Sequence, residues 1–155
     1  MRTPPKPAAG FLIGEAFVAK AVLFCRNLSA VFSANDSSDK AMSLIDLQKR
    51  LCRRFGADFL PSDELLKVGI GRDFDPERFP MNGLRHQPEG DTTGWYIWSG
   101  EEFSEAPGFF DPWHTKHVYD RYPYMAVCLG LAPGWRFSLA PGYEDFWFDA
   151  NLLDI

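Results

Sequence analysis

The sequence predicts an α+β fold: an antiparallel sheet of three to four strands with a C-terminal hairpin, packed by two to three helices. Three observations lead to this prediction. Residues 94–102, GWYIWSGEE, place four large apolar side chains in a row between two glycines, which is the clearest strand signal in the chain. Residues 134–149 have the pattern of a β-hairpin, and residues 43–55 have the spacing of an amphipathic helix.

The first predicted element is the helix at residues 43–55. Ser43 and Asp46 have the spacing of a capping box, and Gly56 is a typical helix terminator. One apolar stripe recurs at helical spacing, formed by Leu44, Leu47, Leu51 and Phe55. We interpret the basic residues of this segment as its solvated side, because the chain as a whole is acidic.

A short strand is predicted at residues 66–70 and the central strand of the sheet at residues 94–99. Between them, residues 71–90 are rich in Pro, Gly and charge, and we interpret them as an ordered or semi-ordered connection. A structureless stretch of about 20 residues is uncommon in a compact domain, so this connection is expected to be packed or functional.

Alternation along the central strand sends Trp95 and Ile97 to one face and Tyr96 and Trp98 to the other. One pair belongs to the core. If the other face of the sheet is solvated, the second pair joins Trp147 in an exposed aromatic patch. If both faces are covered, all of these side chains are core.

Residues 112–129 are predicted to be helical and, with the first helix, to cover the sheet. Asp111 followed by Pro112 is typical of a helix start. Pro123 disfavours helical geometry at the residue before it, which predicts a break and a second short helix that Gly130 closes.

The last elements are strands at residues 135–140 and 144–149, joined by a turn. If residues 140–143 form the turn, the register follows by counting back. The predicted cross-strand pairs are Leu139–Glu144, Phe137–Phe146, Arg136–Trp147 and Trp135–Phe148. Arg136 and Trp147 then share the more polar face, where a cation–π contact is expected.

The length of 155 residues fits one domain, which we place at residues 42–155. Residues 1–41 are predicted to be an N-terminal extension, either disordered or the product of a start codon upstream of Met42. The apolar tract at residues 11–32 contains charged side chains, so neither a membrane span nor a typical signal peptide is indicated.

The three cysteines are Cys25, Cys52 and Cys128, and no CxxC pair is present. Neither a disulfide framework nor a thiolate zinc site is indicated, and a reducing, cytoplasmic location is expected. No cofactor is predicted.

Charge is uneven along the chain. Residues 1–85 hold 13 Lys+Arg and 10 Asp+Glu, whereas residues 86–155 hold 3 and 11. An acidic field disfavours nucleic acid and anionic membranes as partners and favours a basic protein, although an acidic surface also serves solubility alone. The oligomeric state is left open.

Catalytic signals are weak. His114 and His117 lie three apart in the predicted helix, as two ligands of one metal would, and Asp111, Asp120, Glu101 or Glu102 would have to supply the third. The chain has no GxSxG, phosphate-loop or HExxH pattern. No catalytic residue and no metal site are predicted, and a metal-dependent enzyme remains an alternative.

Five motifs in succession resemble immunity proteins of the thirty-third class in bacterial polymorphic toxin systems, or their close relatives. They are residues 82–86 (NGLRH), 89–102 (EGDTTGWYIWSGEE), 109–114 (FFDPWH), 129–137 (LGLAPGWRF) and 143–149 (YEDFWFD). The similarity covers about residues 44–153. It implies a small cytoplasmic protein that neutralises a toxin by binding it, without catalysis of its own.

The expected partner is therefore a cognate toxin with a basic surface. Combining the aromatic face with the acidic segments predicts a partner-binding set of Tyr96, Trp98, Glu101, Glu102, Glu144, Asp145 and Trp147. A carbohydrate or peptide binder that uses the aromatic face is a further alternative.

Overall fold

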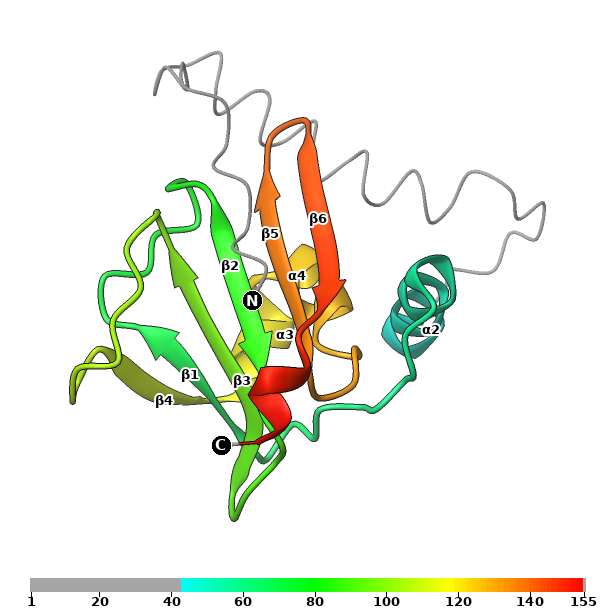
Figure 1. Cartoon of the computed structure of the whole chain (residues 1–155), viewed down its shortest axis with the longest axis horizontal. Helices are drawn as coiled ribbons and strands as arrows, with labels where there is room; N and C mark the ends of the chain where they lie inside the picture. Colours follow the sequence, from blue (N-terminus) through cyan, green and yellow to red (C-terminus); the bar gives the residue numbers. More distant parts are fainter. Residues whose placement is uncertain (1–42, 155) are drawn as a thin grey trace.

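The structure is a computed structural model that describes residues 43–154, so the predicted N-terminal extension lies outside the described residues. Helices cover one face of a six-stranded mixed sheet (Figure 1). The elements in chain order are α2 (Leu44–Phe55), β1 (Lys67–Gly71), β2 (Met81–Arg85), β3 (Thr92–Ser99), β4 (Phe110–His114), α3 (Thr115–Arg121), α4 (Pro123–Cys128), β5 (Trp135–Ala140), β6 (Tyr143–Phe148) and the 3-10 helix η1 (Ala150–Leu153). The α+β class is confirmed, but an antiparallel sheet of three to four strands understates the fold.

The strand order is β4-β1-β3-β2-β5-β6. β1 and β3 are parallel, whereas every other neighbouring pair is antiparallel. β3, the strand of the WYIW run, is bonded to β1 on one side and β2 on the other. The two edge strands are β4 and β6.

The predicted connection at residues 71–90 contains a strand that sequence reasoning missed. Asn82 and Gly83 interrupt the apolar alternation of β2, yet all five residues of this strand are buried. A Cβ atom at Gly83 would overlap the ring of Phe137 on β5. The missing side chain therefore makes room for an aromatic one.

The predicted start of the second helical region at Pro112 is wrong. Asp111 and Pro112 belong to β4, where Pro112 lies opposite Gly69. Proline lacks a backbone donor, which an edge strand tolerates. α3 begins only at Thr115, and the predicted break before Pro123 is confirmed.

Two local predictions hold in detail. The capping box of Ser43 and Asp46 is present at the start of α2, and Gly56 ends this helix in the left-handed conformation. The hairpin register is the predicted one, from Leu139 opposite Glu144 to Trp135 opposite Phe148.

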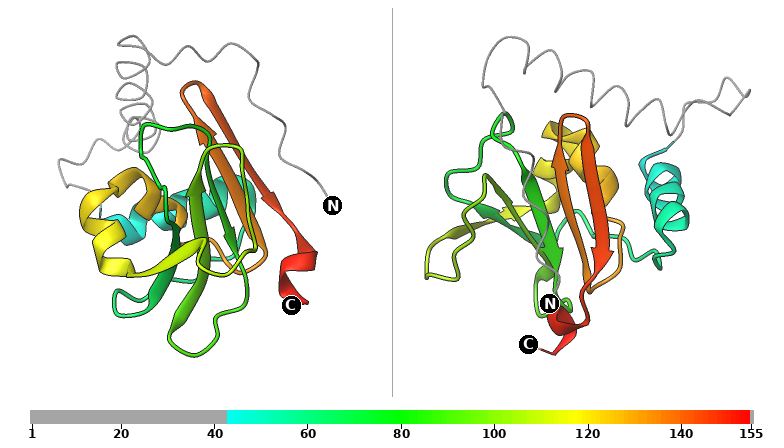
Figure 2. Two further views of the ribbon diagram at one scale, coloured as in Figure 1. Left: turned by 90° about the vertical axis from the view of Figure 1, so that its left-hand side faces the viewer. Right: turned by 45° about the horizontal axis from the view of Figure 1, so that its top comes forward.

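The main core lies between the sheet and the three α-helices, which gather on one side of it (Figure 2). Trp95 and Ile97 of β3 enter this core together with Phe137 of β5. α2 contributes Leu51 and Cys52. Side chains from the helices and from one face of the sheet thus form a single buried cluster. The second face of the sheet is the one that points away from the helices.

Candidate functional site

The candidate site lies on the second face of the sheet, which points away from the helices. Tyr96 and Trp98 of β3 belong to this face, and cross-strand pairing with Leu84 and Asn82 continues it across β2. Trp98 is 5% exposed and Trp147 is 6% exposed, while Tyr96 is half-buried. Of the two alternatives for the sheet, the structure has the one with both faces covered, which leaves little aromatic surface for a sugar.

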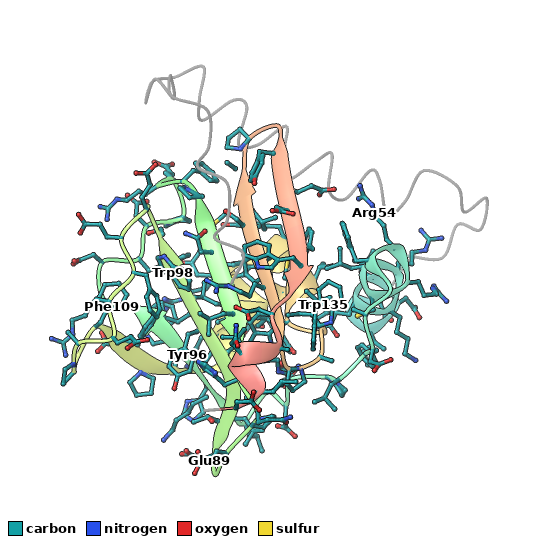
Figure 3. The ribbon with its side chains drawn as sticks, viewed as in Figure 1. Arg54, Glu89, Tyr96, Trp98, Phe109 and Trp135 are labelled. Atoms are coloured by element: carbon teal, nitrogen blue, oxygen red, sulfur yellow. The ribbon has the colours of Figure 1, made fainter. Side chains whose placement is uncertain are left out.

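The cover over Trp98 comes in part from residues 100–109, which connect β3 to β4 and which we call the β3–β4 loop. Phe103 of this loop packs on Trp98 with ring centroids 4.9 Å apart. Phe103 is itself 45% exposed, so one side of its ring is packed and the other faces solvent. Figure 3 shows Trp98 and Phe109 side by side at this part of the sheet.

Three carboxylates flank Phe103 along the chain: Glu101, Glu102 and Glu105. All three residues are exposed, and no ion pair joins them to any residue between 43 and 154. The sequence predicted the first two as partner-binding residues but missed Phe103. The signal that would have found it is the EEFSE pattern, in which a single aromatic side chain interrupts an acidic run.

The remaining predicted carboxylates lie on the hairpin that joins β5 to β6. Cross-strand pairs link Ser99, Met81, Leu139 and Glu144 in one row across four strands. Because neighbouring strands lie about 4.8 Å apart, this row spans about 14 Å. The start of the β3–β4 loop and the β5–β6 turn therefore share one end of the sheet (Figure 1).

The two hairpin carboxylates differ in their surroundings. Glu144 forms an ion pair with Arg54 of α2, in which Nη2 of Arg54 and Oε1 of Glu144 are 2.7 Å apart. Asp145 lies opposite Ser138, on the other face of the sheet. The predicted contact between Arg136 and Trp147 is present, with the guanidinium 5.4 Å from the ring centroid.

Two tryptophans of the second face carry a buried donor without an acceptor. Neither the indole Nε1 of Trp98 nor that of Trp147 has a hydrogen-bond acceptor in the part of the chain that the structure describes. Trp95, on the same strand as Trp98 but the other face, donates its own Nε1 to the carbonyl of Leu129 at 3.2 Å. A buried donor without an acceptor costs about 1–3 kcal/mol, so native proteins seldom retain one.

The two histidines do not share a helix, contrary to the prediction. His114 ends β4 and His117 lies in α3, with ring centroids 6.0 Å apart. Among residues 43–154, no group of three or more His, Cys, Asp or Glu side chains is placed to hold a metal ion. The third ligand that a metal-dependent enzyme would need is therefore not found at this pair.

Arg85 is a residue whose importance sequence reasoning missed. Although only 1% exposed, it donates to the carbonyls of Thr93, Leu60 and Leu131 at 2.7–3.0 Å. Burial lowers the pKa of Arg85 to about 10, which still leaves the guanidinium charged at neutral pH. The side chain thus ties together three segments that are far apart in sequence.

The two cysteines of the described chain are free and buried. Burial raises the pKa of Cys52 to about 11, and Asp58 adds to the effect. Burial also raises the pKa of Cys128 far above its usual value. Neither thiol has the depressed pKa of a nucleophile.

No helix between residues 43 and 154 has the length and apolar character needed to span a bilayer.

Comparison with known proteins adds one family. The sequence model of the Imm33-like domain matches residues 47–149. No curated protein and no solved structure matches the chain at a significant level. The family match runs from α2 to the end of β6 and includes all six strands. The chain therefore belongs to the Imm33-like domain family.

Proposed function

We propose that this protein is a cytoplasmic immunity protein that binds and neutralises a cognate toxin, without catalysis of its own. The observation that carries the proposal is membership of the Imm33-like domain family over residues 47–149. The absence of a catalytic pattern in the sequence agrees with a role in binding.

The proposed binding surface is the end of the sheet where the β3–β4 loop begins and the β5–β6 turn lies. Glu101 and Glu102 are its exposed charges, and Tyr96 and Trp98 precede them along the chain on the second face of β3. Asp145 and Trp147 extend the same face along β6. Glu144 already pairs with Arg54, so its charge is partly neutralised within the protein. A toxin with a basic surface complements this end, because complementary charge speeds association and selects the partner.

The test takes its candidate toxins from the products of the genes that neighbour this one. Coexpression of the full chain should restore growth to cells that make the toxin, and the two purified proteins should form a complex. The dissociation constant should rise as salt is added, because exposed charges are screened over a Debye length of about 8–10 Å at physiological salt. Absence of both rescue and complex formation would reject the proposal.

A matched pair of variants tests the choice of surface. Replacing Glu101 and Glu102 by Gln should weaken binding and reduce its salt dependence. The control replaces Glu64 and Glu89 by Gln, which removes the same charge from exposed positions. Glu89 lies at the opposite end of the sheet (Figure 3), and Glu64 precedes β1, whose Lys67 pairs with Thr92 at that end. Equal effects of the two pairs would leave net charge, and not this surface, as the cause.

A further inference from the structure

We propose that the β3–β4 loop, residues 100–109, is the element that binds the toxin, and that the part of the toxin it binds is an extended basic segment. Phe103 is the apolar anchor of the contact, and the indole N–H of Trp98 donates to a main-chain carbonyl of that segment. This inference rests on the proposed function and names the site and the chemistry of the partner.

The first step of the argument is the packing of Phe103. Its ring contacts Trp98 at 4.9 Å, Phe110 at 6.1 Å and Phe109 at 6.5 Å between centroids. These neighbours hold one side of the ring, whereas 45% of the residue stays exposed. Exposed aromatic side chains often dominate interface energies, and this ring is available to a partner on its exposed side.

The second step is charge. Glu101, Glu102 and Glu105 surround this anchor in sequence, and no cation between residues 43 and 154 pairs with them. The nearby arginines lie at the two stems of the loop. Arg78 packs beside Gly100, and Arg72 lies beside Gly108. A segment with Lys or Arg side chains would supply the missing counter-charges.

The third step is the unsatisfied donor of Trp98, the residue on whose ring Phe103 packs. Trp98 is only 5% exposed, and its Nε1 has no hydrogen-bond acceptor among residues 43–154. A carboxylate from the partner would be repelled by the glutamates of the loop, so the acceptor that fits is a neutral main-chain carbonyl. An extended segment presents such carbonyls at regular intervals, whereas a helix uses them internally.

Access to Trp98 requires that Phe103 shifts. The loop begins at Gly100 with φ +89° and its return stem contains Gly108 with φ +83°, a region that other residues rarely adopt. Glycine at both stems lets the loop change its backbone angles without a side-chain clash. The anchor can then move aside while the strands that hold Trp98 stay in place.

The principal experiment measures the dissociation constant of the full chain with its toxin for Phe103→Ala and Phe148→Ala. Phe148 is a matched control because it is 51% exposed but lies at the other end of β6, where its ring packs on Trp135. Phe103→Ala should weaken binding at least about ten-fold, as truncation of a central aromatic anchor does. Phe148→Ala should change it less than about two-fold.

A second experiment isolates the hydrogen bond. Trp98→Phe keeps an aromatic ring but removes the donor, and should weaken binding about three- to ten-fold. Its thermal unfolding midpoint in the free protein should not fall in proportion, because no internal hydrogen bond is lost. Trp95→Phe is the contrasting variant, since it deletes the bond to Leu129 and should lower the midpoint. In the complex, the indole N–H proton signal of Trp98 should move downfield, and that of Trp95 should not.

The outcomes separate this inference from the proposed function. If the unmodified chain does not bind the toxin, the proposed function fails. If the unmodified chain binds the toxin and Phe103→Ala retains full affinity, the loop is not the element that binds the toxin and the inference is overturned. Unchanged affinity for Trp98→Phe, or an unmoved Trp98 indole signal, overturns the assignment of the donor.

Discussion

Arg85 shows how one residue organises distant segments. The guanidinium lies 5.7 Å from the centroid of the Trp95 ring, and its partners are three carbonyls with no carboxylate among them. A buried charge without a counter-ion is normally costly, but a planar group with five donors serves several acceptors at once. Arg85 therefore supplies donors to main-chain carbonyls of three segments: the start of β3, the stretch around Leu60 and the stretch around Leu131.

Replacing Arg85 by Met should destabilise the protein by at least about 3 kcal/mol, because buried carbonyls would lose their donors. Arg85→Lys should recover only part of this loss, since an ammonium group cannot reach three separate carbonyls. Urea unfolding of the three proteins measures the free-energy differences. A lysine variant as stable as the parent would show that charge alone, and not the planar fork, is required.

At the scale of elements, the sequence predicted those whose signals are local. The cap at Ser43, the stripe of α2 and the register of the hairpin each depend on residues close together in the chain. β2 and β4 were missed because their stability comes from neighbours. Gly83 is explained by the Phe137 ring, which occupies the space of a side chain at that position. Pro112 is tolerated in β4 because β4 is an edge strand.

The candidate site was predictable to the same extent. The acidic charge of Glu101 and Glu102 can be seen in the sequence. So can the two alternatives for Tyr96 and Trp98, which lie either on a covered face or on a solvated one. The role of Phe103 as the cover of Trp98 was not, because it arises from a loop folding back over a strand. Which face of a strand is covered depends on the tertiary structure.

Gly83→Ala tests the fit between β2 and β5. The added methyl group would overlap the Phe137 ring, which packs against Trp95 and Phe146 and has little room to move. We expect a loss of about 1–3 kcal/mol, typical of overpacking. Thermal or urea unfolding measures it, and Gly142→Ala is a control, because a Cβ atom at that turn position meets nothing within 4 Å. Gly142 has φ +74° and Gly83 has no positive φ, so the control shows the cost of backbone strain without overlap. An unchanged stability of Gly83→Ala would exclude overpacking at that position.

At the scale of the whole molecule, the two faces of the sheet differ in how much they bury. The helical face buries the main core, in which α2 and α4 contact each other and contribute Cys52 and Cys128. The second face has a smaller cluster around Trp98, Leu84 and Leu152 and carries the acidic loop. Our proposal places partner binding on the side opposite the main core, so variants of the β3–β4 loop should affect binding more than folding.

Because of the buried thiols, the stability of this core should vary with pH in the alkaline range. Burial raises the pKa of Cys52 from 9.0 to about 11 and raises that of Cys128 as well. Above pH 9 the unfolded chain releases these protons while the folded chain keeps them, so stability is fully present below pH 9 and falls as the pH rises toward 11. At pH 10 the loss should be about 2 kcal/mol relative to pH 8.

Urea unfolding of the full chain at pH 8, 9 and 10 measures this dependence. The double variant Cys52→Ala, Cys128→Ala should be less stable at pH 8, because it loses packing, but its stability should fall much less between pH 8 and 10. The pKa of Tyr119 is also raised by burial, so a small decline of the same sign should remain near pH 10. Measurements stop at pH 10 because the lowered pKa of Arg85 acts with the opposite sign above it. A double variant with the same slope as the parent would show that the two thiols do not couple the core to pH.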